Sequence, residues 1–113
     1  MASVIRGSDN FDSLVHQGIG VNQTWQDVTA SRVVGTTYTN TTGKPIFVSI
    51  STSTSVASSN GIVLYIDGVI RLGDSNIGSN SGYASGVNGI IPNGSTYAII
   101  LAGETINAWS ELR

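Results

Sequence analysis

Residues suited to catalysis are few and far apart in this sequence. Nucleophilic catalysis needs a base beside the nucleophile, and the single histidine, His16, lies in an irregular N-terminal stretch. Glycoside hydrolysis needs two carboxylates roughly 5–9 Å apart across a sugar. The seven acidic residues are dispersed, with Asp67 in a tight turn and Glu111 near the end of the chain. We therefore expect no enzymatic activity.

One segment has the pattern of a cation-binding loop. Residues 74–80 read Asp-Ser-Asn-Ile-Gly-Ser-Asn and place oxygen-bearing side chains at alternate positions, as a calcium loop does. However, the twelfth residue counted from Asp74 is Ser85 rather than the bidentate Glu of an EF-hand, and one carboxylate compensates a dication weakly. The glycine-rich phosphate motifs are incomplete as well. The sequence predicts no metal site and no cofactor.

What remains is the chemistry of recognition. Aromatic faces stack on sugars and protein surfaces, and neighbouring amides and hydroxyls form hydrogen bonds at modest entropic cost. Tyr38, Tyr65 and Tyr97 fall in expected strands, where core or interface packing is the commoner role, whereas Tyr83 lies in a stretch of Gly and Ser. The candidate ligand or receptor residues, all in expected polar loops, are Asn60, Asn76, Asn80 and Tyr83.

The elements that must position these residues are strands. Val and Ile together number 24 against 5 Leu, and branching at Cβ suits a pleated strand better than a helix. At 113 residues the chain is long enough for one core only. Seven or eight short strands separated by Gly and Asn turns are typical of an antiparallel, jelly-roll-like β-sandwich, expected over residues 22–113. Residues 1–21 are expected to form an irregular arm or linker with a short helix, and its candidate docking residues are Phe11, Leu14 and Val15.

Charge and composition exclude several classes of partner. The net charge is −2 and the five basic residues are scattered, so a nucleic-acid partner is not expected. No apolar run approaches the roughly 18 residues of a membrane span, and the N-terminus lacks the features of a signal peptide, so we expect synthesis in a cytoplasm and no membrane insertion. Without cysteine, disulfides are excluded.

The hydrophobic pattern places strands and loops along the chain. The first strands are expected at residues 23–28 and 33–40. Residues 46–50 alternate aliphatic with other side chains, which predicts a half-buried strand with its aliphatic face inward. Polar residues and glycine dominate 51–61 and 73–89, so both are expected to be loops, the second longer than most connections in a compact domain.

The clearest local signal is a hairpin over residues 62–72, closed by Asp67-Gly68 in a type I′ turn. In that register Ile66 lies opposite Val69. The two faces would then carry Leu64 and Ile66 on one side, and Val63, Tyr65 and Leu72 on the other. Because both faces are apolar, one is expected to meet the core and the other a neighbouring subunit.

Two parts of the sequence resemble a known family. Residues 22–32 (NQTWQDVTASR) and 35–46 (GTTYTNTTGKPI) look like a segment that recurs near the C-termini of tail fibre and related tail proteins of tailed bacteriophages. The chain also ends as those proteins do, with an Ile-Pro-Asn-Gly turn at 91–94, a Thr-Tyr strand start and a final Trp-Ser-Glu-Leu-Arg at 109–113. The resemblance covers residues 20–113, although the middle, 53–89, matches no pattern that we can name.

The resemblance implies a small β-sandwich that forms a homotrimer at the distal end of a fibre or in the tail tip and contributes to host adsorption by receptor binding. The expected location is the virion, after synthesis in the host bacterial cytoplasm. The expected partners are two further copies, other tail or capsid proteins through residues 1–20, and a host glycan or outer-membrane receptor. The candidate residues for trimer or core packing are Trp25, Leu64, Tyr65, Ile66 and Trp109.

Two other functions fit the same sequence. One is a purely structural virion protein, such as a capsid decoration, head fibre or collar protein, in which the polar loops cap the fold and touch no receptor. The other is an unrelated lectin-like module or a hydrolase built on a β-sandwich. Solution mass separates a trimer from a monomeric enzyme, whereas neighbouring tail or head genes separate the two kinds of virion protein.

Overall fold

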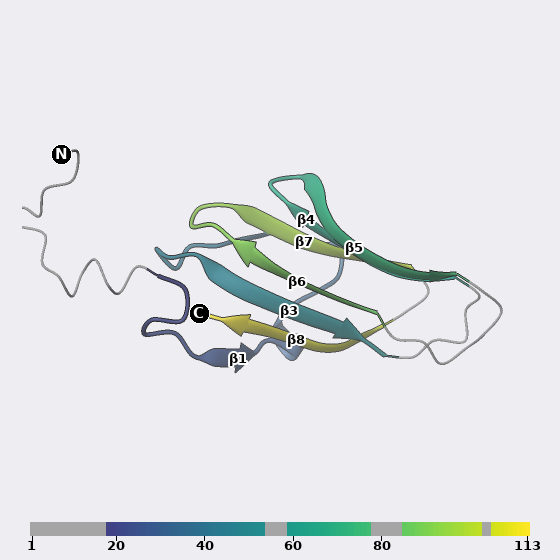
Figure 1. Ribbon diagram of the computed structural model, residues 1–113, viewed down its shortest axis with the longest axis horizontal. Helices are drawn as coiled ribbons and strands as arrows, with labels where there is room; N and C mark the ends of the chain where they lie inside the picture. The colour runs from purple at the N-terminus through teal and green to yellow at the C-terminus, as the bar shows by residue number, and fades with distance from the viewer. Residues whose placement is uncertain (1–17, 54–58, 78–84, 103–104) are drawn as a thin grey trace, which may run out of the picture.

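The computed structural model describes residues 18–53, 59–77, 85–102 and 105–113. Within these ranges the chain forms eight strands and one 3₁₀ turn (Figure 1). In chain order they are β1 (Trp25–Asp27), η1 (Thr29–Ser31), β2 (Tyr38–Thr39), β3 (Ile46–Thr52), β4 (Ser59–Ile66), β5 (Val69–Ile77), β6 (Gly86–Ile91), β7 (Thr96–Ala102) and β8 (Ile106–Leu112).

The strands form two four-stranded sheets. Sheet I has the order β1-β8-β3-β6, sheet II has the order β2-β7-β4-β5, and every strand pair is antiparallel. The all-β class and the β-sandwich are thereby confirmed. Within the described ranges, no helix has the length and apolar character needed to cross a membrane.

The core lies between the two sheets and follows from the alternation of side chains along each strand. In β3 the residues are buried and half-buried in strict alternation, as the sequence predicts for this strand. The buried apolar residues come from both sheets, so each sheet covers the inner face of the other. They are Ile46, Val48, Ile50, Ile62, Leu64, Val87, Ile91, Tyr97, Ile99 and Trp109.

The first two strands are shorter than expected. Strand β1 keeps only the centre of 23–28, and β2 keeps only two residues of 33–40. The chain turns at η1, where the Asp27 carboxylate accepts hydrogen bonds from the amide and hydroxyl of Thr29. It turns again at Gly35, whose φ of 84° is left-handed backbone that favours glycine. Two turns between β1 and β2 leave no room for a long strand in this part of the chain.

The two expected loops are wrong at all four ends, and at the first of them strand β4 already begins at Ser59. Strand β3 continues to Thr52, β5 continues from Gly73 to Ile77, and β6 begins at Gly86. These polar stretches pair because the bonds of an antiparallel ladder join backbone groups and do not depend on apolar side chains. Gly61 lies opposite Ser75, for example.

The hairpin between β4 and β5 has the expected turn. Both Asp67 and Gly68 have positive φ, 54° and 78°, as a type I′ turn requires, and Ile66 lies opposite Val69. The predicted faces are wrong for Leu72, because the register shifts between Leu64 and Tyr65. The bulge puts Leu72 opposite Leu64 and on the same face.

Candidate functional site

A buried carboxylate lies between the sheets near the end of β8. Glu111 is fully buried and accepts five hydrogen bonds. One oxygen accepts from Arg32 at 2.9 Å and from Arg113 at 2.9 Å. The other accepts from the Nε of Arg32 at 3.1 Å, the Tyr97 hydroxyl at 3.0 Å and the Trp109 indole at 3.1 Å. This Glu111 cluster joins β8, β7 and the connection between β1 and β2.

The groups around Glu111 stabilise its negative charge inside the domain. Burial by itself raises the pKa of Glu111, but the hydrogen bonds and charge of Arg32, with Tyr97 and Arg113, outweigh it and hold this pKa below its ordinary value. Burial, and after it the charge of Glu111, raises the pKa of Tyr97. A carboxylate that is fully buried and bound by five donors is not available as a general base.

A buried amide holds together two turns at one end of the sandwich. The Asn40 side-chain amide donates to the carbonyls of Lys44 at 2.7 Å, Ile91 at 3.0 Å and Pro92 at 3.2 Å. Its oxygen accepts from the amide and hydroxyl of Thr42. Asn40 is 1% exposed, so these five bonds satisfy a polar group that has almost no access to water.

Both arrangements join segments that are far apart in the sequence. Asn40, just after β2, binds the carbonyls of Ile91 and Pro92, 51 and 52 positions later. Arg32, between η1 and β2, forms an ion pair with Glu111 in β8. The two arrangements therefore tie the first part of the described chain to its last strands.

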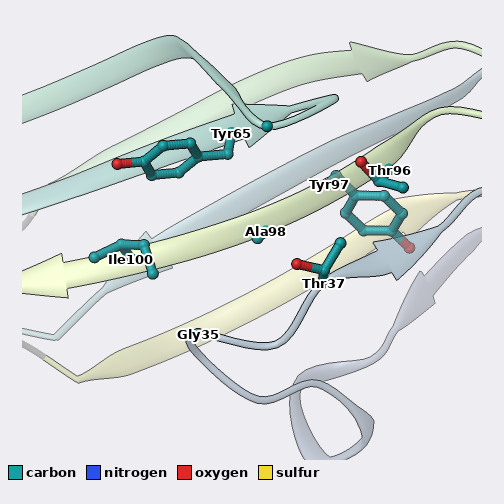
Figure 2. Close-up of a pocket in the computed structure, with 8 residues that line it drawn as sticks. Gly35, Thr37, Tyr65, Thr96, Tyr97, Ala98 and Ile100 are labelled. Carbon is teal, nitrogen blue, oxygen red and sulfur yellow. The ribbon is translucent and has the colours of Figure 1, made fainter.

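A groove of about 300 Å³ opens on the outer face of sheet II (Figure 2). Small residues form its hollow. Ala98 is 9% exposed but lies on the outer side of β7, because its neighbours Tyr97 and Ile99 belong to the core cluster and Ala98 does not. Tyr65 lies opposite Ala98 on β4, and Gly35 borders β7 by donating its amide to the carbonyl of Ile99 at 2.8 Å. The outer groove is lined by Gly35, Thr37, Tyr65, Gly68, Thr96, Tyr97, Ala98 and Ile100.

The lining of the outer groove combines apolar surface with unpaired hydroxyls. Among the described residues, the hydroxyls of Thr37, Tyr65 and Thr96 have no hydrogen-bond partner. No lining residue is charged. The nearby carboxylate of Asp67 is already bound by the Ser95 hydroxyl and the Thr96 amide. The groove therefore presents donors and acceptors without a net charge.

An apolar surface lies along the edge where the two sheets meet on one side. Strand β5 is the edge of sheet II, β6 is the edge of sheet I, and the two strands contact each other. Four large aliphatic side chains on them are 41–58% exposed, although such residues are normally buried. We name these four the β5–β6 edge surface: Val69, Ile70, Leu72 and Ile90. Val69 and Leu72 lie on the same side of sheet II as Ile66 and Leu64, whereas Ile70 lies on the outer face of sheet II and Ile90 on the outer face of sheet I.

A second apolar row crosses the outer face of sheet I. Trp25 lies opposite Leu112, Leu112 opposite Phe47, and Phe47 opposite Ile90, so one row spans all four strands. Trp25 is 55% exposed, and its ring meets Phe47 edge-on at 5.8 Å. Trp25 is therefore a surface residue, whereas Trp109, the other predicted packing tryptophan, lies in the core.

The structure separates the other predicted residues. Leu64 belongs to the core, Ile66 packs against it half-buried, and Tyr65 lines the outer groove. The backbones of Asn60 and Asn76 lie directly opposite each other in β4 and β5 rather than in loops, which corrects the expected placement. The side chains of both, together with Asn80, Tyr83 and the docking residues Phe11, Leu14 and Val15, lie outside the described residues.

The outer groove and the Glu111 cluster were missed by sequence reasoning. Their residues come from strands that are distant in the sequence and adjacent only after folding. A faint signal existed for the groove, because Ala98 is the small residue in an otherwise bulky strand of Tyr, Ile and Leu. Among the described residues, no three His, Asp or Glu side chains gather in a group fit for a metal ion.

The chain was compared with protein-family models, curated proteins and solved structures, and none of them matches it.

Proposed function

We propose that this chain is a structural protein of a bacteriophage virion, of the tail fibre or tail-tip class. In this proposal it assembles as a homotrimer and contributes to host-surface attachment without catalysing a reaction. The observation that carries the proposal is the β5–β6 edge surface, because it is apolar and it borders two open sheet edges. The sequence stretches that resemble phage tail proteins supply the class and the number of subunits.

An uncovered edge of this kind favours self-association. Edge strands expose unpaired backbone groups, and soluble proteins normally protect them with charges, proline or a covering segment. Among the described side chains of β5 and β6, only Arg71 is charged. Ile70 is 58% exposed beside it. In a closed ring of three subunits, the edge surface of each subunit packs against the neighbouring subunit. The apolar side chains of all three copies are then buried away from water.

The order of the strands supports a jelly-roll topology. β1 pairs with β8, β2 with β7, β3 with β6, and β4 with β5. A long antiparallel hairpin that wraps around a barrel gives these four nested pairs. Alternate pairs then fall in opposite sheets: β1–β8 and β3–β6 in sheet I, β2–β7 and β4–β5 in sheet II. Jelly rolls of eight strands occur in viral capsid proteins and lectins, which agrees with a virion protein but does not by itself indicate a function.

The two ends of the sandwich differ in a way that suits attachment. The turns braced by Asn40 lie at the end where Thr24 and Arg113 exchange backbone hydrogen bonds, and Figure 1 shows the C-terminus at this end. Asn60 and Asn76 lie toward the opposite end. In the proposal the first end joins other virion proteins through residues 1–20, and the second faces the host.

The trimer is tested by measuring mass in solution with light scattering. The wild-type chain is expected at three times its 11.7 kDa mass. Ile70→Lys, which places a charge on the edge surface, is expected to dissociate the trimer. Val33→Lys is the matched control, because Val33 is 61% exposed but precedes β2 at the other edge of sheet II. A monomeric wild type, or equal dissociation by both variants, would overturn this interface.

The virion role is tested by labelling. Antibodies against the purified chain are applied to virions from the bacterium that carries the gene, and gold particles are located by electron microscopy. Label at the distal tail supports the proposal. Label on the head overturns the tail assignment and favours the decoration alternative, and virions without label overturn both.

A further inference from the structure

We propose that the outer groove of sheet II binds a neutral sugar residue in its pyranose form, presented by a glycan of the host surface. This inference rests on the attachment role proposed above and adds to it a site and a ligand class. The site differs from the polar loop residues that the sequence singles out, because it lies on a sheet face and is built by strands and one connection.

The first requirement for sugar binding is an aromatic face beside an apolar floor. A pyranose has a face of C–H groups that packs on an aromatic ring, whereas its hydroxyls point outward. Figure 2 shows the ring of Tyr65 near Ile100, with Ala98 between Tyr65 and the connection that carries Gly35. Tyr65 is half-buried, so its ring is held by the sheet and needs little ordering on binding.

The second requirement is a set of neutral hydrogen-bonding groups. Thr96 lies two residues before Ala98 on β7, Thr37 lies on the connection that carries Gly35, and Tyr65 adds a third hydroxyl (Figure 2). Since none of the three has a partner among the described residues, each is able to donate and accept without first breaking a bond in the protein. A charged ligand would find no opposite charge among the lining residues, so a neutral sugar is the better match.

The third argument is size. The groove volume of about 300 Å³ lies at the lower limit of the roughly 300–1,000 Å³ found for small-molecule sites. One sugar residue suits this volume, and the rest of a glycan would continue into solvent. The groove also leaves the trimer free to form, because it extends from β4 across β7 to the connection before β2, whereas the edge surface lies on β5 and β6.

The experiment uses ligand-observed NMR on the full chain in its native oligomer. The probes are the methyl glycosides of glucose, galactose and mannose, with glucuronic acid and sialic acid as charged comparators. We expect saturation transfer to at least one neutral glycoside and none to the charged sugars. Tyr65→Ala is expected to weaken binding at least about tenfold, and Ala98→Val to abolish it by filling the floor.

Thr39→Val is the matched control. Thr39 is exposed on the neighbouring β2 but does not line the groove, so binding should be unchanged. Thermal unfolding of each variant verifies that it is folded. No transfer to any neutral glycoside, preferential binding of the charged sugars, or binding that survives Ala98→Val would overturn the groove assignment.

The assignment of the groove and the proposed function can be disproved independently. A trimer that labels the tail but binds no glycoside removes the groove assignment and leaves the virion role. A monomer that is absent from virions and still binds a neutral glycoside through Tyr65 ends the virion role and leaves the groove as a lectin site.

Discussion

Burying a charged side chain in a small domain lowers the stability of the fold by roughly several kcal/mol unless other groups compensate the charge. Glu111 is compensated by two guanidinium groups, a phenol and an indole. Arg32 is held in turn over the ring of Tyr38, 4.7 Å from its centre. At the scale of single residues, this cluster is the most sensitive point of the molecule.

Replacement of Glu111 by Gln is expected to lower the free energy of unfolding by about 3 kcal/mol, because it leaves Arg32 beside buried groups without a counter-charge. Arg113→Gln is the control, since it removes one of the five bonds and should cost about 1 kcal/mol. Urea unfolding at neutral pH measures both. Equal losses in the two variants would show that Glu111 is not the centre of the cluster.

The same cluster predicts an acid dependence. The folded-state pKa of Glu111 lies below its ordinary value of 4.5, so its contribution to stability is present above that pH and is lost as the pH falls through the folded-state pKa. The difference in unfolding free energy between wild type and Glu111→Gln should therefore narrow on acidification below pH 4.5. A difference that stays constant down to the acid transition would contradict this assignment.

Tyr97 predicts an alkaline dependence of the opposite sign. Its pKa is raised above the ordinary 10.0, so its contribution is present below that pH and is lost as the pH rises through the folded-state pKa. An absorbance titration of tyrosinate should contain a step above pH 10.0 that is missing in Tyr97→Phe. If the variant retains this step, another tyrosine produces it.

At the scale of elements, the turns are fixed by side chains and the strands by their neighbours. Asn40→Ala should lower the free energy of unfolding by about 3 kcal/mol, because three carbonyls and the Thr42 amide lose a buried partner. Asn93→Ala is the matched control, since exposed Asn93 accepts one bond from Gly43, and it should cost at most about 1 kcal/mol. Chemical denaturation compares the two, and a cost for Asn40→Ala no larger than the control would contradict the brace.

Close packing between β6 and the hairpin predicts a difference between two glycines. A Cβ on Gly89 would lie 2.8 Å from Cδ2 of fully buried Leu64, so Gly89→Ala should cost about 2 kcal/mol. On Gly73 the nearest atom, the carbonyl oxygen of Ile62, would be 3.6 Å away, so Gly73→Ala should change stability by less than about 0.5 kcal/mol. Thermal unfolding distinguishes them, and equal effects would place the tight contact elsewhere.

Elements with strong local signals were predictable, and those defined by pairing were not. Alternation in β3 and the Asp67-Gly68 turn are local, and both are confirmed. The far end of β5 was read as a loop because Ser and Asn have low strand propensity, but its backbone is already aligned by the hairpin. The bulge after Leu64 was not predictable, since no residue there demands one.

The candidate sites divide in the same way. The sequence gives Trp109 and Leu64 as packing residues because of their size and hydrophobicity. It cannot show that Arg32 meets Glu111 across 79 positions, or that Gly35 and Ala98 form one hollow, because both depend on how the sheets close. Exposed Trp25 shows the limit, since a large aromatic residue alone does not indicate burial.

At the scale of the whole molecule, the proposed trimer couples folding to protein concentration. Burial of the edge surface in the native state makes the unfolding temperature rise with concentration, because unfolding then separates three chains. Calorimetry over a roughly hundredfold range of protein concentration should show a rising unfolding temperature for wild type and Val33→Lys. For Ile70→Lys the unfolding temperature should not change with concentration. An unfolding temperature independent of concentration in all three would indicate a folded monomer.

The side-chain bonds that define the fold gather around Asn40 and Glu111, whereas Gly61, Ser75 and their neighbours are aligned by backbone pairing. Backbone pairing tolerates nearly any sequence that avoids proline. In such a domain we expect residues at the open end of the β4–β5 hairpin, away from the Asp67-Gly68 turn, to be replaceable with less loss of stability than residues around Asn40 and Glu111. This division suits it to rapid diversification under selection, and to the grafting of foreign peptides onto a constant frame.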